Sequence, residues 1–173
     1  CNKPRIFHID KDNPYLKYEN EMVLSKDGKK LFAAYTKCPH TIIPNGVEVI
    51  GGSAFMNDQK LESVMFPKSI RMIKSCVFSN CPKLRCVVLP EGFEKFRVQC
   101  FDENLSLKHI DLPSTLTDLG EMTFADCPNL ETVVLRSPKK LDYRWCFDAI
   151  LYDNKMVNPY LYVPADLVEQ YKQ

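Results

Sequence analysis

The chain lacks the features that identify several common classes of protein. No run reaches the about eighteen apolar residues that a membrane-spanning helix needs. The 23 basic and 22 acidic side chains are mixed, leave a formal charge of +1 and form no block that would follow a phosphate backbone. Three scattered histidines are too few for a zinc site, and the sequence has no nucleophile elbow, glycine-rich phosphate loop or Cys-x-x-Cys pair. These absences argue against nucleic-acid binding, membrane insertion by this segment and any metal or cofactor.

What the chain does contain is a repeat of 23 residues. Proline, phenylalanine and leucine each return at this spacing, which chance does not explain. A unit of about 20 to 29 residues with regularly spaced leucines predicts a solenoid, whose coils stack and share one continuous core. The three columns are Pro44, Pro67, Pro90 and Pro113; Phe55, Phe78, Phe101, Phe124 and Phe147; and Leu61, Leu84, Leu107 and Leu130.

Each repeat has an alternating segment just before its proline, which is typical of a half-buried strand. Stacked coil on coil, these segments predict a parallel sheet, and the proline, which cannot donate a ladder hydrogen bond, ends each strand. A second apolar pair follows, and the phenylalanines then fill the middle of the coil on a short helical or irregular stretch. The predicted inward residues are Val64, Phe66, Val87, Leu89, Ile110, Leu112, Val133 and Leu135 in the strands, and Val47, Ile50, Ile70, Ile73, Phe93, Phe96, Leu116 and Leu119 after the prolines.

The eight cysteines do not indicate a disulfide framework, because of where the repeat places them. Cys81 shares a column with Cys127, and Cys100 with Cys146, in each case two coils apart. Two coils correspond to about 9.6 Å between Cα atoms, whereas a disulfide tolerates at most about 6.8 Å. We therefore predict free thiols, most of them buried as small apolar side chains.

Both ends of the chain depart from the repeat. Residues 1–43 read as a partial repeat, with Phe7 and Ile9 facing inward, followed by a β-hairpin in which residues 22–25 and 30–35 flank Asp27-Gly28. Residues 44–135 are four regular repeats. Residues 136–173 read as a degenerate repeat and a cap, with a strand over 160–163 and a short helix whose apolar side carries Leu167, Val168 and Tyr171. All three parts are expected to form one solenoid domain.

The start of the chain has a second interpretation. It has no initiator methionine and no signal peptide, so we expect a processed or shortened form of a longer protein. Cys1 would then be either a residue in the middle of a repeat, aligned with Cys81, or a lipid-anchored cysteine left by signal cleavage.

The pattern L-x-x-V-x-F/L-P-x-x-V/I-x-x-I-x-x-x-A-F, as in LESVMFPKSIRMIKSCVF, resembles the BspA-like leucine-rich repeats. The hairpin segment and the ending LYVPADLVEQYK also resemble segments common in surface proteins of Bacteroidetes. The resemblance implies a leucine-rich repeat solenoid that is mainly β, with its parallel sheet on the concave face. It further implies a secreted or surface-exposed bacterial protein, extracellular or lipid-anchored to the outer membrane, and in some members an adhesin for host matrix proteins or other cells.

The outward-facing strand positions are the candidate binding residues, because solenoids bind partners on their concave sheet. Met65, Val88 and Val134 make an apolar stripe, interrupted by Asp111, and charged side chains edge it. An exposed apolar stripe with a charged rim often marks a protein-contact surface. The candidates are Ser63, Met65, Arg85, Cys86, Val88, Lys108, His109, Asp111, Thr132 and Val134, and Glu62 and Glu131 complete the charged edge.

Three functions follow from these residues. The first is a non-enzymatic adhesion module that binds a host protein or a glycan through the sheet. The second is a structural spacer in a longer surface protein, without a ligand of its own. The third is a cysteine-dependent enzyme, because Cys86 and His109 share a column on neighbouring coils with Asp111 close by. Asn104-Leu105-Ser106 matches a glycosylation sequon, but the place of Asn104 in a turn favours a structural role.

Overall fold

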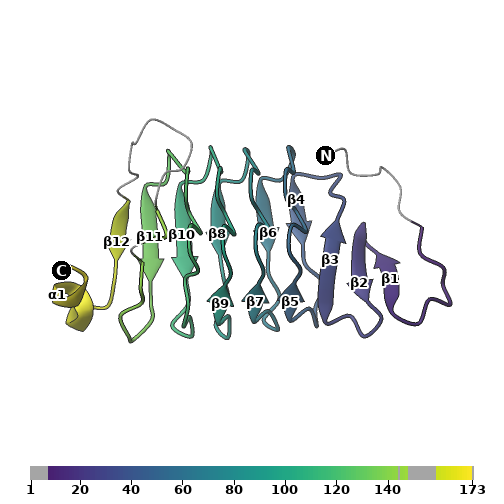
Figure 1. The fold of residues 1–173 in the computed structure, drawn as a ribbon, viewed down its shortest axis with the longest axis horizontal. Helices are drawn as coiled ribbons and strands as arrows, with labels where there is room; N and C mark the ends of the chain where they lie inside the picture. Colours follow the sequence, from purple (N-terminus) through teal and green to yellow (C-terminus); the bar gives the residue numbers. More distant parts are fainter. Residues whose placement is uncertain (1–7, 144, 148–158, 173) are drawn as a thin grey trace.

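The computed structural model describes residues 8–143, 145–147 and 159–172. The described chain winds into an elongated solenoid whose coils lie side by side along the long axis (Figure 1). Its strands form two six-stranded sheets. Sheet A has the order β1 (Leu16–Glu19), β2 (Met22–Ser25), β3 (Lys30–Ala34), β5 (Val49–Ile50), β7 (Met72–Ile73) and β9 (Lys95–Phe96). Sheet B has the order β12 (Tyr160–Tyr162), β11 (Thr132–Leu135), β10 (His109–Leu112), β8 (Cys86–Val88), β6 (Ser63–Met65) and β4 (His40–Ile42).

Sheet B is the parallel sheet that the alternating segments predict. Its pairing follows the repeat, with Ser63 beside Cys86, Cys86 beside His109 and His109 beside Thr132. The predicted inward residues of these strands are buried except Phe66, which is partly buried against the core. The prediction of a leucine-rich repeat solenoid, mainly β and with very little helix, is therefore confirmed.

The phenylalanine column forms a continuous interior stack. Successive ring centroids are 5.0, 5.1, 6.0 and 5.7 Å apart along Phe55, Phe78, Phe101, Phe124 and Phe147, and neighbouring rings are stacked within 25° of parallel. The first four rings are fully buried. Stacking of equivalent coils thus places the same side chain in the same environment, as the repeat predicts.

The second apolar pair of each repeat is buried as predicted. These residues also lie in or beside a second parallel ladder, part of sheet A, which was not predicted. Sheet A pairs Val49 with Met72 and Met72 with Lys95, one coil apart. Each of these strands has two residues, and so short a segment cannot show an alternating pattern.

The phenylalanines lie on turns between the two sheets, where backbone conformation also repeats. Eight of the ten described non-glycine residues with positive φ fall in two columns: Ser53, Cys76, Gln99 and Met122, and Asn57, Asn80, Glu103 and Asp126. This left-handed conformation costs about 1–2 kcal/mol for each non-glycine residue. The backbone N–H groups of these turns point along the solenoid axis, as in the bonds from Cys76 N to Val98 O and from Phe78 N to Cys100 O at 3.1 and 2.9 Å. Every bond of this kind among the described coils runs from one coil to a carbonyl of the next coil toward the C terminus.

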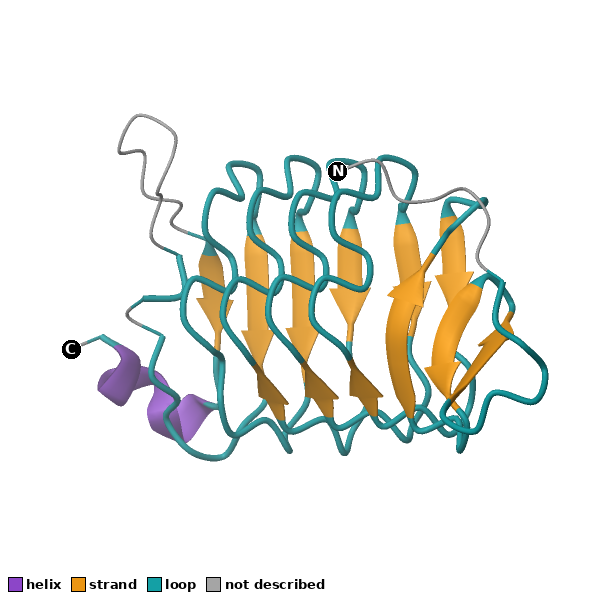
Figure 2. Ribbon diagram, turned by 45° about the vertical axis from the view of Figure 1, so that its right-hand side comes forward, coloured by secondary structure: helices purple, strands orange, loops and turns teal. Residues whose placement is uncertain are grey.

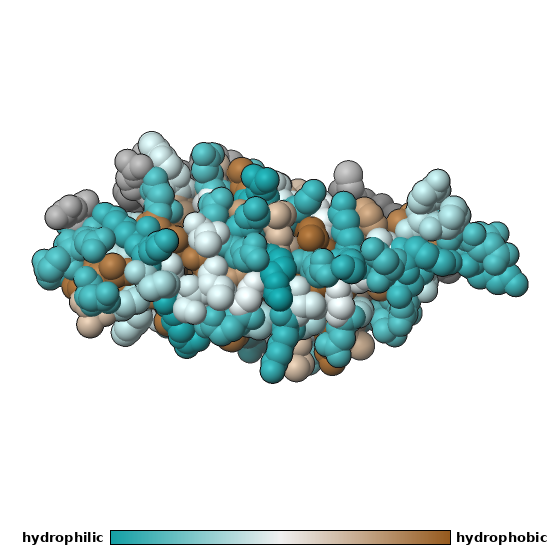
Figure 3. Space-filling view, turned by 90° about the horizontal axis from the view of Figure 1, so that it is seen from below, coloured by the Kyte–Doolittle hydropathy of each residue, from teal (hydrophilic) through white to brown (hydrophobic). Residues whose placement is uncertain are grey.

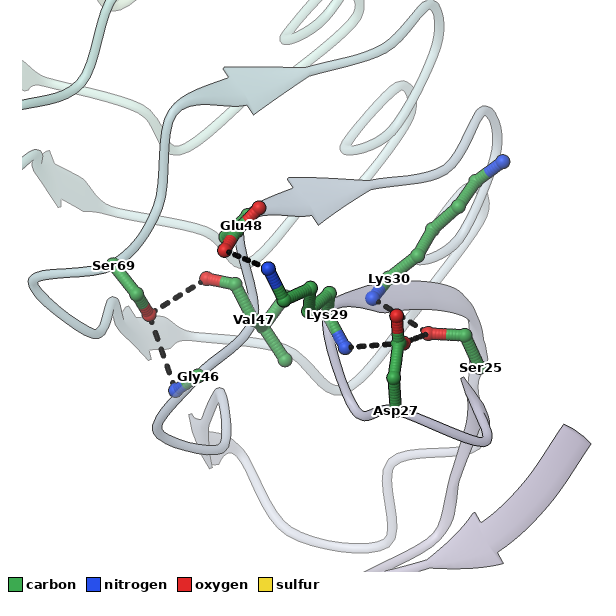
Figure 4. Close-up of polar contacts among 8 residues, drawn as sticks. All are labelled: Ser25, Asp27, Lys29, Lys30, Gly46, Val47, Glu48 and Ser69. Atoms are coloured by element: carbon green, nitrogen blue, oxygen red, sulfur yellow. Dashed lines mark hydrogen bonds and ion pairs between the residues drawn. The ribbon is translucent and has the colours of Figure 1, made fainter.

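Side-chain hydroxyls join neighbouring coils at two of the turns that lead from sheet B to sheet A. The Ser69 hydroxyl accepts a hydrogen bond from Gly46 N at 3.2 Å and donates one to Val47 O at 2.8 Å (Figure 4). Thr115 repeats this arrangement two coils later, with Gly92 N and Phe93 O. Figure 2 shows the resulting regularity of the loops, which follow one another in parallel along the array.

The predicted β-hairpin is confirmed as β2 and β3, which pair antiparallel around Asp27-Gly28. Gly28 has φ +76°, and Asp27 accepts hydrogen bonds from the Ser25 hydroxyl and Lys29 N (Figure 4). Strand β3 pairs parallel with β5, so the hairpin closes one end of the core, and an ion pair between Lys29 and Glu48 joins it to the first repeat. Strand β1 was not predicted, since the turn before β2 uses Asn20 and Glu21 with positive φ and has no glycine.

The predicted role of the cysteines holds for the described residues. Cys100 and Cys127 are buried free thiols, so no disulfide joins Cys81 to Cys127 or Cys100 to Cys146, as predicted. Burial raises the pKa of the Cys127 thiol to about 12. Asn104 is fully buried and donates both amide hydrogens, to Phe78 O at 2.9 Å and Phe101 O at 2.7 Å, which confirms its structural role.

The C-terminal cap consists of η1 (Ala165–Leu167) and α1 (Val168–Tyr171). Leu167 is buried, and Tyr171 packs on Tyr143 and accepts a hydrogen bond from Leu141 N at 2.8 Å through its hydroxyl. Val168 is exposed, contrary to the prediction that it faces inward, because the helix is only one turn long. At the other end, Phe7 and Cys1 lie outside the described residues, and Ile9 is half-buried and belongs to no strand.

Candidate functional site: the outer face of sheet B

The outer face of sheet B presents two columns of side chains. Because successive residues of a strand point to opposite faces, the second residue of each strand faces the core and its neighbours face outward. The second residue is buried in five of the strands, and Leu161 in β12 is partly buried. The register aligns these neighbours across all six strands. We call them the polar column, which is His40, Ser63, Cys86, His109, Thr132 and Tyr160, and the apolar column, which is Ile42, Met65, Val88, Asp111, Val134 and Tyr162.

Large apolar side chains are exposed along the apolar column. Ile42, Met65, Val88 and Tyr162 are 67%, 64%, 54% and 58% exposed, whereas Val134 is half-buried. Each of these side chains rests on the backbone of a regular sheet, so the column is a preformed surface. Exposed apolar side chains gathered in this way often mark a contact surface.

All ten predicted site residues lie on this face or at its edge. Three aromatic or apolar members of the columns, Ile42, Tyr160 and Tyr162, were missed by the sequence reasoning, as was His40. Subtracting 23 from Met65 and Ser63 would have found Ile42 and His40. The two tyrosines follow a stretch in which the repeat decays, so only their alternation with Leu161 and Val163 marks them.

Paired charges edge the polar column. Arg85 lies 3.7 Å from Glu62, and Lys108 lies 2.9 Å from Glu131, in both cases across neighbouring coils. These pairs are exposed, so each contributes on the order of 0–1 kcal/mol to stability. Their main effect is to keep opposite charges interspersed along this edge.

Asp111 interrupts the apolar column as predicted, and the structure shows how it is held. Arg136, which occupies the place of the repeat's proline, donates to Asp111 Oδ2 at 2.7 Å. The other oxygen, Oδ1, is buried without a hydrogen-bond partner among the described residues. Arg136, which replaces the proline of the repeat, therefore supplies the positive charge that pairs with the carboxylate of Asp111 on the previous coil.

The arrangement around Cys86 does not resemble an activated nucleophile. Cys86 and His109 are register neighbours, but no hydrogen bond joins their side chains in the described structure. Burial, and then the nearby charge of Asp111, raise the pKa of the Cys86 thiol. Catalytic cysteines instead need a lowered pKa, because the thiolate is the nucleophile.

We therefore expect Cys86 to react with iodoacetamide at pH 7.5 more slowly than free cysteine does. Its raised pKa leaves a smaller fraction of thiolate at that pH. Quantitative peptide mapping by mass spectrometry gives the rate at each thiol of the folded protein. Faster alkylation at Cys86 than of free cysteine would revive the enzymatic hypothesis.

The rest of the described surface offers few alternatives. No cluster of three or more metal-ligating side chains occurs among the described residues. Within the same residues, no helix has the length and apolar character that crossing a bilayer requires. Seen along the edge where the turns join the two sheets, the surface is mostly hydrophilic, with small separated apolar areas (Figure 3).

The fold and its 23-residue coils define a leucine-rich repeat protein. The sequence profile of the BspA type leucine rich repeat region matches residues 26–150 in six copies. The chain belongs to this family. Membership of the family indicates a protein-interaction or structural repeat module. No curated protein sequence matches the chain.

Solved structures share the fold at low sequence identity. The pneumococcal vaccine antigen PcpA is similar with a TM-score of 0.74 and 17% identity over 93% of this chain and 45% of that one. A leucine-rich repeat protein from Eubacterium ventriosum has a TM-score of 0.68 and 18% identity over 74% and 35%. A leucine rich cell surface protein from Faecalibacterium prausnitzii has a TM-score of 0.52 and 19% identity over 74% and 46%. This chain thus spans less than half the length of each of these three.

Proposed function

We propose that this chain is a protein-binding module of a bacterial surface or secreted protein, and that it binds its partner through the outer face of sheet B. The observation that carries the proposal is the apolar column, in which three neighbouring strands expose Ile42, Met65 and Val88 by more than half. Contact residues of this kind are favoured at the centre of interfaces, where they are desolvated on binding.

The tyrosines extend the same surface toward the C terminus. Tyr160 is 77% exposed and continues the polar column, while Tyr162 continues the apolar one. Tyrosine is enriched at interfaces because its ring packs against apolar groups and its hydroxyl accepts or donates a hydrogen bond. A partner would therefore meet an apolar centre flanked by hydroxyl, imidazole and paired charged groups. An adhesive role toward a host matrix or cell-surface protein, or a glycan, follows this chemistry and the family.

The test compares binding of wild type with that of Met65→Glu and Val88→Glu. A panel of host extracellular-matrix proteins and glycans is first screened with the wild-type chain by surface plasmon resonance. Each glutamate places a charge at the centre of the contact, so we expect affinity for the bound ligand to fall about tenfold or more. Leu105→Glu is the matched control, because Leu105 is also exposed but lies outside sheet B, and it should bind like wild type. Circular dichroism establishes that all three variants fold.

The alternative is a structural spacer without a ligand of its own. The regular core and the interspersed surface charges favour it, because they suffice to make a stable rod. Equal binding by both column variants and wild type would remove the apolar column as the site. If the wild-type chain binds no member of the panel, the spacer is the better explanation.

A further inference from the structure

A groove of about 330 Å³ lies away from sheet B, on the turns that follow β9. Its lining includes Gly120, which occupies a column in which the two preceding coils carry Lys74 and Arg97. Gly120 has φ +68°, and a Cβ there would lie 2.4 Å from Arg97 O. Only glycine fits this position, because the turn passes close against the backbone of the preceding coil.

Trp145 forms part of the lining of this groove and is the only tryptophan in the chain. Its side chain is 60% exposed, although its backbone is fixed by a hydrogen bond from Met122 N to its carbonyl at 2.8 Å. Val98, also in the lining, is 38% exposed. The groove thus offers an aromatic face and an aliphatic contact that no described residue covers completely.

The charged groups around the groove are unequal in sign. Asp118 and Glu121 contribute two carboxylates to the lining, and Arg97 contributes one guanidinium. Asp118 is held in place because its Oδ1 accepts a hydrogen bond from Gly120 N at 2.9 Å. Negative charge beside an exposed indole favours a cation, which gains from both the carboxylates and the ring face.

We propose that this groove binds a basic side chain, lysine or arginine, of a partner polypeptide. The alkyl part of the side chain lies against Trp145 and Val98, and its charged end lies among the carboxylates of Asp118 and Glu121. Lysine and arginine suit such a site because an aliphatic stem can contact apolar surface while the charged end stays solvated. This second contact is independent of the outer face of sheet B.

The test uses the peptide acetyl-Gly-Lys-Gly-amide and the same peptide acetylated on the lysine. We expect the lysine peptide to change the emission of Trp145 in a saturable manner, with a Kd on the order of 1–10 mM for so small a ligand. Its lysine ε-methylene protons should shift upfield in NMR spectra, since they lie over the indole ring. The acetylated peptide and a neutral oligosaccharide should produce neither effect.

Variants separate local contact from general attraction between opposite charges. Glu121→Gln should weaken peptide binding about two- to fivefold, as expected for loss of one exposed charge contact. Glu94→Gln makes the same charge change outside the groove and should leave binding unchanged. Trp145→Leu should abolish the upfield shift. Met65→Glu, which tests the face of sheet B, should have no effect here.

Three results would overturn the proposal. The first is the absence of a saturable response to the lysine peptide. The second is an equal response to the acetylated peptide, and the third is equal weakening by Glu94→Gln and Glu121→Gln. A response to the oligosaccharide alone would assign the groove to a sugar instead.

Discussion

We expect the replacement of Phe101 by alanine to lower the free energy of unfolding by about 3–5 kcal/mol. Phe101 is fully buried and stacks on Phe78 and Phe124, with centroid distances of 5.1 and 6.0 Å. Phe96 also contacts it edge-on at 5.6 Å. The cavity left by truncation would lie in the middle of the solenoid, where rigid coils on both sides limit collapse. Urea denaturation followed by circular dichroism measures the change.

Phe32→Ala is the matched control for this result. Phe32 is 38% exposed and lies on β3, outside the stack. Its truncation should cost about 1 kcal/mol or less. If Phe101→Ala cost no more than this control, the stack would not be the stabilising centre of the fold.

Asp102→Asn is expected to stabilise the protein at neutral pH. Asp102 is only 5% exposed, and its Oδ1 has no hydrogen-bond partner among the described residues. Burial raises the pKa of Asp102 from 3.8 to about 6, a rise to which the charges of Glu103 and Asp126 add. The ionised form therefore destabilises the folded state, whereas asparagine has nearly the same shape and is neutral at every pH.

The effect of Asp102 depends on pH in a direction that follows from the raised pKa. Below pH 3.8 the carboxyl of Asp102 is protonated in both the folded and the unfolded protein, so its ionisation costs no stability. Between pH 3.8 and about 6 the unfolded protein loses this proton while the folded protein keeps it, and the free energy of unfolding therefore falls as the pH rises. One unit of pKa difference between the folded and unfolded states corresponds to about 1.4 kcal/mol. The rise from 3.8 to about 6 therefore lowers the free energy of unfolding by about 3 kcal/mol once the pH is above 6.

Denaturation curves of wild type and Asp102→Asn at pH 3.5 and pH 8 measure this difference. We expect the variant to be more stable by up to about 3 kcal/mol at pH 8, and the gain to disappear at pH 3.5. Asp12→Asn, in an exposed turn, should change stability by less than about 0.5 kcal/mol at either pH. A gain that is equal at both pH values would show that ionisation of Asp102 is not its cause.

The sequence predicts most of the repeat and less of what lies outside it. Phe78 and Phe101 were placed correctly because stacking converts a fixed spacing into a fixed environment. The two-residue strands of sheet A carry no alternation and were missed. Strand β1 was missed because its turn relies on Asn20 and Glu21 in an unusual conformation.

The candidate sites show the same contrast. Met65 and Val88 were predicted to face outward because a regular strand fixes the direction of each side chain. The groove beside Trp145 is lined by residues of three successive coils, the last of them in the stretch where the repeat has decayed. Such a feature appears only when neighbouring coils are placed side by side.

The turns that carry the phenylalanines give the solenoid an electrical polarity. Their backbone bonds between coils all point the same way, so the peptide dipoles add, as they do in an α-helix, whereas those of ordinary strands largely cancel. Each row of hydrogen-bonded amides therefore ends in N–H groups, with partial positive charge, toward the C terminus, and in carbonyl groups, with partial negative charge, toward the N terminus. Every added coil lengthens these rows, so the two ends of the solenoid present partial charges of opposite sign to an approaching molecule.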